Sequence, residues 1–176
     1  MNDGTTPLLS IRNLVTHFPL DEGTVIAVDG ASFDVYEGKT LGIVGESGCG
    51  KSVTARSILQ ILDRPGRIME GEILFRRRGD DGASGTDEVV DLTEFEPDGD
   101  EMRSIRGGEI GLVFQEPMTS FSPVHSVGNQ LMEAITLHRD VTRKEAREIA
   151  VELLRTVGIP LAEERLNAYS FELSGG

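Results

Sequence analysis

The apolar and polar residues of the first 75 positions follow the short periods typical of β-strands. Residues 8–15 roughly alternate between apolar and polar side chains, which predicts a half-buried strand. Two apolar runs, 24–28 and 31–35, flank Asp29-Gly30, a pair typical of a tight turn, and predict two short strands. Another short strand is expected over 72–75. The N-terminal region is therefore expected to form antiparallel strands.

Two other short runs are almost wholly apolar and predict buried strands. Residues 40–44 stop at Gly45, and residues 110–114 lead into Gln115. A continuous apolar run of this length is typical of a strand that is covered on both faces.

Three segments have the spacing of amphipathic helices. Residues 51–62 place apolar side chains on one face and end before Pro65-Gly66. A second helix is expected over 126–138, and a third over 142–157, where Thr142 and Glu145 have the spacing of a capping box. The apolar stripe predicted for this last helix consists of Ala146, Ile149, Ala150, Leu153, Leu154 and Val157.

Length and composition restrict the class of protein. A chain of 176 residues with 38% hydrophobic residues is long enough for one domain with a real core, with or without a small appendage. No run of 18 apolar residues predicts a membrane span, and the N-terminus lacks the pattern of a secretory signal. The single cysteine cannot form an internal disulfide or a zinc site alone. We therefore expect an intracellular protein.

The formal net charge of −13 is concentrated in one segment. Ten acidic residues and no Lys or Arg lie between Asp80 and Glu101, so the rest of the chain carries only −13 + 10 = −3. An acidic chain is a poor partner for nucleic acid, and none is expected. Residues 76–101 are interpreted as an exposed acidic insertion, because such charge runs are usually solvated loops.

The strongest chemical motif is a glycine-rich loop between a predicted strand and a predicted helix. Residues 45–52 read Gly-Glu-Ser-Gly-Cys-Gly-Lys-Ser, which fits the phosphate-binding P-loop, or Walker A, pattern. The glycines let the backbone turn its N–H groups toward phosphate oxygens, and the helix N-terminus adds positive potential. Lys51 would place an ammonium on the β- and γ-phosphates, and Ser52 would offer a hydroxyl to Mg²⁺. Cys49 is interpreted as a small residue at a variable position of the loop.

Four motifs together resemble the ATP-binding subunits of ATP-binding cassette (ABC) transporters, and in particular those of dipeptide and oligopeptide importers. They are Gly-Glu-Ser-Gly-Cys-Gly-Lys-Ser-Val-Thr-Ala-Arg-Ser at 45–57, Gly-Glu-Ile-Leu-Phe at 71–75, Ile-Gly-Leu-Val-Phe-Gln-Glu-Pro-Met-Thr-Ser at 110–120, and Glu-Leu-Ser-Gly-Gly at 172–176. The resemblance implies an α/β fold of the P-loop NTPase class, incomplete in this chain. Residues 1–115 would hold the antiparallel strands and part of the P-loop core, and residues 116–176 a helical subdomain.

The resemblance also implies roles for individual residues. Gln115 resembles the Q-loop glutamine, which ligates Mg²⁺ or holds a water, and with Lys51 it makes up the catalytic residues expected here. Phe18 resembles the aromatic residue that stacks on adenine. The nucleotide-binding residues implied are Phe18, Gly45, Glu46, Ser47, Gly48, Cys49, Gly50, Lys51, Ser52 and Val53. The signature motif, which acts on the nucleotide of a partner subunit, corresponds to Leu173, Ser174, Gly175 and Gly176.

Several parts of the family pattern do not occur within these 176 residues. The Walker B strand ending in Asp-Glu, the D-loop and the switch histidine have no counterpart, and His17, His125 and His138 match no family position. We therefore expect little or no ATPase activity from this chain alone, and low stability if residues 40–44 find no partner strand.

Three interpretations of function follow. The first is the N-terminal portion of an importer's ATP-binding subunit, which couples ATP binding and hydrolysis to uptake of peptides or related solutes. The second is a truncated, non-catalytic nucleotide-binding or interaction protein, and the third a compact P-loop kinase. Under the first, the cofactors are ATP and Mg²⁺, and the partners are transmembrane permease subunits, a second ATP-binding subunit and, indirectly, a solute-binding protein. The location implied is peripheral, at the cytoplasmic face of the membrane.

Overall fold

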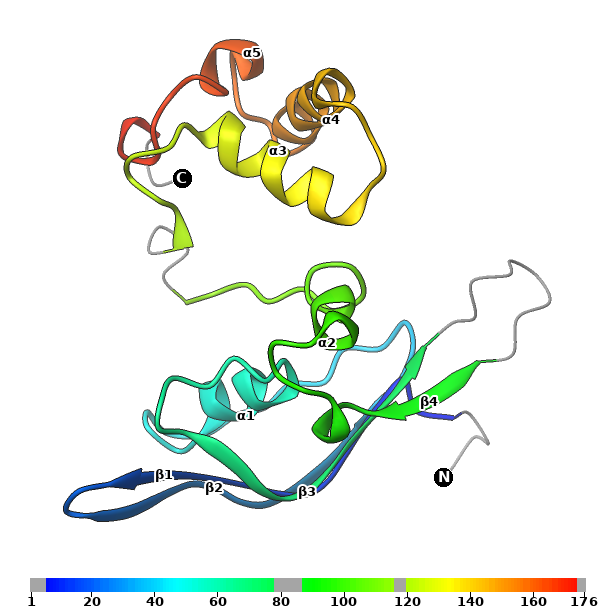
Figure 1. Cartoon of the computed structure of the whole chain (residues 1–176), viewed down its shortest axis with the longest axis vertical. Coiled ribbons are helices and arrows are strands. Elements are labelled where there is room, and N and C mark those ends of the chain that lie inside the picture. The colour runs from blue at the N-terminus through cyan, green and yellow to red at the C-terminus, as the bar shows by residue number, and fades with distance from the viewer. Residues whose placement is uncertain (1–5, 78–86, 116–119, 174–176) are drawn as a thin grey trace. The chain divides into compact units, whose positions relative to one another are not determined.

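The computed structural model describes residues 6–77, 87–115 and 120–173 of the chain (Figure 1). By its internal contacts the chain divides into two compact units, Met1–Ile110 and Gly111–Gly176. The first is built on a β-sheet and the second on helices.

The sheet of the first unit is antiparallel and has the order β2-β1-β3-β4. Its strands are β1 (Leu9–Leu20), β2 (Gly23–Val35), β3 (Arg67–Arg77) and β4 (Glu88–Asp91). Helices α1 (Lys51–Ile58) and α2 (Asp100–Ile105) lie on the same side of this sheet (Figure 1).

Strand β1 occupies a central position in the sheet because it pairs with β2 on one side and β3 on the other. The strand predicted over 8–15 is confirmed and continues to Leu20. Ile11, Leu14 and Thr16 of β1 are fully buried. A strand with partners on both edges satisfies its backbone groups within the sheet, so its apolar side chains can be enclosed.

The prediction of two strands around a turn at Asp29-Gly30 is wrong. Residues 23–35 form the single strand β2, and the chain reverses at Asp21 and Glu22, between the paired residues Leu20 and Gly23. The register passes from Leu14 opposite Ala31 to Thr16 opposite Val28, so β2 contains one extra residue there. Gly30, with φ of 70°, takes up this bulge, and a bulge uses the same residue types as a tight turn.

The acidic segment is only partly the exposed insertion that its charge predicts. Residues 78–86 lie outside the described residues, but β4 pairs with β3, and Leu92 in the short 3-10 helix η2 (Leu92–Glu94) is fully buried. The Asp91 carboxylate accepts hydrogen bonds from the N–H groups of Ile73 (3.0 Å) and Thr93 (2.9 Å). Charge counting missed this structure because isolated apolar residues among the acids supply the core.

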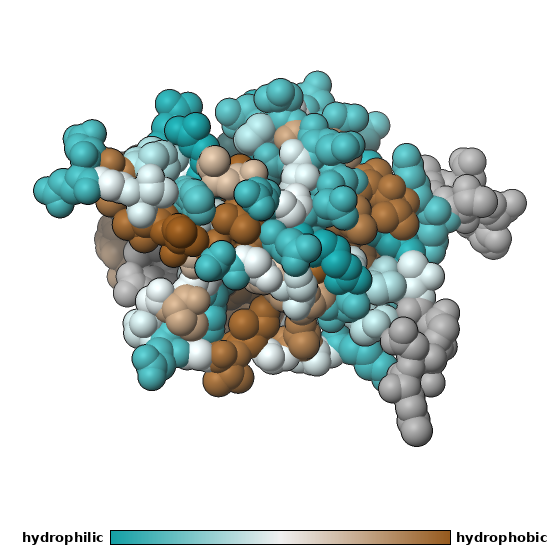
Figure 2. All heavy atoms as spheres, turned by 90° about the horizontal axis from the view of Figure 1, so that it is seen from below, coloured by the Kyte–Doolittle hydropathy of each residue, from teal (hydrophilic) through white to brown (hydrophobic). Residues whose placement is uncertain are grey.

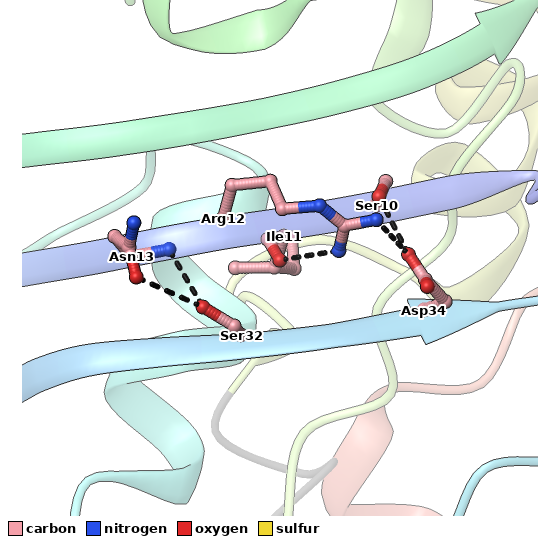
Figure 3. Close-up of polar contacts among 6 residues, drawn as sticks. All are labelled: Ser10, Ile11, Arg12, Asn13, Ser32 and Asp34. Atoms are coloured by element: carbon pink, nitrogen blue, oxygen red, sulfur yellow. Dashed lines mark hydrogen bonds and ion pairs between the residues drawn. The ribbon is translucent and has the colours of Figure 1, made fainter.

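A polar cluster on β1 and β2 fixes the pairing of these strands (Figure 3). The Ser10 hydroxyl donates to Asp34 Oδ1 (2.6 Å), and Arg12 Nη2 lies 2.7 Å from the same oxygen. The hydrogen bond from Ser10 lowers the pKa of Asp34, and the hydrogen bond and charge of Arg12 lower it further. Next to them, the Asn13 N–H donates to Ser32 Oγ (2.8 Å).

The second unit packs three helices, α3 (Val127–His138), α4 (Arg143–Thr156) and the short α5 (Ala162–Arg165), followed by the 3-10 helix η4 (Ser170–Glu172). The helices predicted over 126–138 and 142–157 are confirmed. The core formed by α4, α5 and the residues that follow contains Ala150, Val151, Leu154, Ala162 and Leu166.

The capping box of α4 is confirmed. The Thr142 N–H donates to Glu145 Oε2 (2.7 Å), and the Glu145 N–H donates to Thr142 Oγ1 (3.3 Å). The Thr142 hydroxyl also donates to Glu145 Oε2 (2.7 Å), and this hydrogen bond, together with that of the Thr142 N–H, lowers the pKa of Glu145. The predicted apolar stripe is partly wrong, because Leu153 and Val157 are exposed while Val151, which lies outside the predicted stripe, is buried. The buried face of α4 is therefore displaced toward Val151 from the face that the sequence pattern predicts.

The two buried strands predicted over 40–44 and 110–114 are not present. Residues 39–44 and 111–114 have no regular secondary structure, and Val44 and Val113 are 95% and 89% exposed. Within the described part of the chain, neither segment belongs to the sheet. An apolar run becomes a strand only where a neighbour accepts its backbone hydrogen bonds.

The predicted helix over 51–62 forms but ends early, at Ile58. Leu59 is the C-cap, and Gln60 has a φ of 51°.

Among the described residues, no helix combines the length and the apolar character that crossing a membrane requires. On the face drawn in Figure 2, apolar side chains reach the surface in patches separated by hydrophilic residues.

Candidate nucleotide-binding loop

Residues 45–50 form a loop that leads directly into α1, as the P-loop pattern predicts. The loop makes a turn in which the Cys49 N–H donates to the Glu46 carbonyl (3.3 Å). Gly50 is the N-cap of α1 and has a left-handed backbone with φ of 92°. A Cβ atom at Gly50 would lie 2.3 Å from the carbonyl oxygen of Ala27 in β2, so only glycine lets the loop rest on the sheet.

The Lys51 side chain folds back into the loop. Its ammonium donates hydrogen bonds to the carbonyl oxygens of Gly45 (2.8 Å) and Glu46 (2.6 Å) and lies 3.5 Å from Cys49 Sγ. A positive charge is therefore held at the inner side of the turn, close to the N-terminus of α1. This is where a phosphate group would need it.

The first turn of α1 adds to this positive potential. Gly50 offers no side-chain acceptor to the helix, and the first turn contains no acidic residue. The N–H groups of a helix start and the helix dipole both favour an anion at such an end. Ser52 in the same turn is exposed, so its hydroxyl is accessible. The loop, the ammonium and this hydroxyl together fit a polyphosphate with a bound Mg²⁺.

Helix α1 is held on the sheet by a buried hydrogen bond. The hydroxyls of Thr16 in β1 and Ser57 in α1 lie 3.0 Å apart, and both residues are fully buried. Ser57 also donates to the Val53 carbonyl (2.9 Å). Two buried hydroxyls that satisfy each other fix the helix without leaving an unpaired polar group. The sequence pattern predicts that Ser57 lies in a helix, but neither Ser57 nor Thr16 carries a signal for this contact.

Phe18 lies two residues beyond Thr16 in β1, on the face of the strand that meets α1. Its side chain is half-buried, and its ring packs against Gly66. The sequence indicated Gly66 only as part of the signal that ends a helix. The packing of Gly66 against an aromatic ring could not be found in the pattern.

The remaining predicted site residues belong to the second unit. Gln115 is exposed and lies in neither a helix nor a strand. Leu173 is half-buried and follows η4, whereas Ser174, Gly175 and Gly176 lie outside the described residues. The structure thus brings together the predicted residues of the P-loop, and the roles of Gln115 and the signature motif stay predictions.

One pocket of the first unit lies away from the P-loop residues. It has a volume of about 940 Å³ and is lined by most of residues 60–71, by residues 93–98 and by Arg106. The Arg106 guanidinium donates to the carbonyl oxygens of Leu59 (2.7 Å), Gln60 (3.1 Å) and Pro97 (2.6 Å). Burial lowers the pKa of Arg106. Its hydrogen bonds hold two loops together, so we assign this arginine a structural role.

In the described ranges, no group of three or more His, Cys, Asp or Glu side chains is arranged to hold a metal ion.

Comparison with known proteins agrees with the class that the loop and fold define. The family model described as ABC transporter matches residues 28–176. The chain belongs to the ABC transporter family. This confirms the resemblance drawn from the motifs and sets aside the compact kinase.

Individual relatives narrow the family further. The chain is 46% identical over 170 residues to a protein of Sinorhizobium fredii named as a probable peptide ABC transporter ATP-binding protein, covering 96% of this chain and 47% of that one. It is 43% identical to the dipeptide transport ATP-binding protein of Bacillus subtilis, with the same coverage, and 41% identical to the oligopeptide transport ATP-binding protein of that organism, covering 97% of this chain and 44% of the relative. The chain spans about half the length of the curated relatives it matches.

A solved structure confirms the fold class. The dimeric structure of a bacterial ABC transporter cassette superposes with a TM-score of 0.71 at 22% identity, covering 95% of this chain and 63% of the cassette. The first unit therefore contains the antiparallel sheet and P-loop helix of an ABC-type P-loop NTPase, and the second is its helical portion.

Proposed function

We propose that this chain binds ATP with Mg²⁺ and forms the N-terminal portion of the ATP-binding subunit of an importer for peptides or related solutes. The observation that carries the proposal is the Lys51 ammonium, held inside a glycine-rich turn at the start of α1. The names of the relatives, which are peptide, dipeptide and oligopeptide transport proteins, support the class of solute.

In this proposal different groups of the P-loop bind the phosphates and the Mg²⁺ ion. Backbone N–H groups of residues 45–53 and the Lys51 ammonium bind phosphate oxygens, and the Ser52 hydroxyl is a ligand of Mg²⁺. Phe18 stacks on adenine, and Gln115 contributes its amide oxygen to Mg²⁺ or to a water. When bound, ATP supplies the free energy of its terminal phosphoanhydride bond. Leu173, Ser174, Gly175 and Gly176 act on the nucleotide of a second ATP-binding subunit.

The assembly follows from the same assignment. We propose that the subunit works at the cytoplasmic face of the membrane, as a peripheral partner of transmembrane permease subunits and of a second ATP-binding subunit. A solute-binding protein would act indirectly, through the permease. The family membership supports this assembly.

Equilibrium binding of ATP in the presence of Mg²⁺ tests the proposal. Lys51→Ala removes a charged hydrogen-bond donor from the phosphates and is expected to weaken binding by about 10-fold or more. Lys144→Ala, which removes an exposed lysine in α4, is the matched control and is expected to leave the affinity unchanged. Equal affinity of both variants and the parent chain would overturn the proposal.

A further inference from the structure

Gly66 is in direct contact with the aromatic ring that we assign to adenine. A Cβ atom at this glycine would lie 2.6 Å from Cε1 and 2.7 Å from Cζ of Phe18, both within the ring. These distances are far below van der Waals contact, so any side chain at position 66 would displace the ring. The ring can occupy its position on β1 only because residue 66 has no side chain.

The turn that carries Gly66 is tied to the P-loop helix. The Gly66 N–H donates to the Asp63 carbonyl (2.8 Å), which closes the turn over residues 63–66. The Asp63 carboxylate pairs with Arg56 in the last turn of α1. Helix α1 is fixed in turn to β1 by the buried pair Thr16 and Ser57. Helix α1 therefore begins at the P-loop and, at its other end, is paired with the turn that contacts the Phe18 ring.

We propose that Gly66 is a positioning residue for the nucleotide base: it sets the place of the Phe18 ring, and through it the distance between the adenine and phosphate sites. This inference rests on the proposed function, because it gives Phe18 the base-stacking role. Gly66 acts on the base through Phe18 and lies outside the P-loop. Its replacement should therefore weaken binding of ATP and leave binding of a ligand without a base unchanged.

Binding of ATP and of inorganic tripolyphosphate, each with Mg²⁺, separates the two parts of the site. Phe18→Ala is expected to weaken ATP binding by about 10-fold, the scale of one lost base–aromatic stack, and to leave tripolyphosphate binding unchanged. Gly66→Ala is expected to act in the same direction, by about 5-fold for ATP. Gly111→Ala is the matched control, because a Cβ atom there meets no atom within 4 Å.

The double variant shows whether Gly66 acts through the ring. In the Phe18→Ala background, adding Gly66→Ala is expected to cause no further change in the ratio of the ATP affinity to the tripolyphosphate affinity. If Gly66→Ala leaves the ratio of the ATP affinity to the tripolyphosphate affinity unchanged, the inference is overturned. The proposed function would still be supported in that case if Lys51→Ala weakens ATP binding. Failure of the parent chain to bind ATP would overturn both.

The Cβ atom of Gly66→Ala would also lie 2.9 Å from the Asp63 carbonyl oxygen, so the substitution could disturb the turn itself. Thermal unfolding distinguishes this effect from the clash with the Phe18 ring. Leucine at position 18 has neither Cε1 nor Cζ. Gly66→Ala is therefore expected to lower the melting temperature less in the Phe18→Leu background than in the parent. Equal losses in both backgrounds would show that the ring is not what Gly66 accommodates.

Discussion

Strand β1 and residues 40–44 differ in the structure, although the sequence predicts a strand with buried apolar side chains both at the start of β1 and at residues 40–44: only β1 forms such a strand. Ile11 and Leu14 of β1 are fully buried between two partner strands, whereas Val44 is almost fully exposed. Hydrophobicity alone therefore does not decide burial in this chain. The difference shows that an apolar segment is enclosed only where neighbouring strands satisfy its backbone.

The largest effect that tests this comparison is on stability. Leu14→Ala should lower the free energy of unfolding by about 2–5 kcal/mol, because it leaves a cavity in the sheet's core. Val44→Ala should change it by less than about 0.5 kcal/mol, because an exposed side chain loses no packing. Denaturant unfolding followed by circular dichroism measures both, and a comparable loss in Val44→Ala would show that residues 39–44 are packed.

A smaller effect concerns the polar cluster that holds β1 to β2. The pKa of Asp34 is lowered in the folded chain, chiefly by Ser10, so its contribution to stability is present above the unfolded value near 3.8 and lost as the pH falls through the lower folded value. The stability difference between the parent and Asp34→Asn should be less than about 1 kcal/mol at neutral pH, since the group is partly exposed. Unfolding measured from pH 7 to pH 2 should show this difference shrinking below pH 3.8. A difference that stays constant would contradict the assignment.

The sequence predicted those features whose cause is local. The capping box of α4 depends on two residues three positions apart, and the P-loop depends on eight consecutive residues, so both could be identified from their patterns. The strand at 8–15 was identified from its alternation, but its extension to Leu20 depends on pairing with residues 23–26.

What the sequence missed depends on residues far apart in the chain. The hydrogen bond between Thr16 and Ser57 spans 41 positions, and the contact of Gly66 with Phe18 joins a loop to a strand. The bulge at Gly30 was interpreted as a turn because both require a positive φ. The absence of strands at residues 40–44 and 110–114 could not be predicted from their composition, since composition does not reveal whether a partner strand is present.

In the proposed function, the backbone of the P-loop and the start of α1 bind the phosphates of ATP. Hydrogen–deuterium exchange of the chain, with and without ATP and Mg²⁺, tests this directly at the level of single peptides. We predict that ATP slows exchange in a peptide covering residues 45–54, that exchange in residues 143–156 of α4 does not change, and that Lys51→Ala reduces the protection. Equal exchange of residues 45–54 with and without ATP would show that the P-loop does not bind the nucleotide.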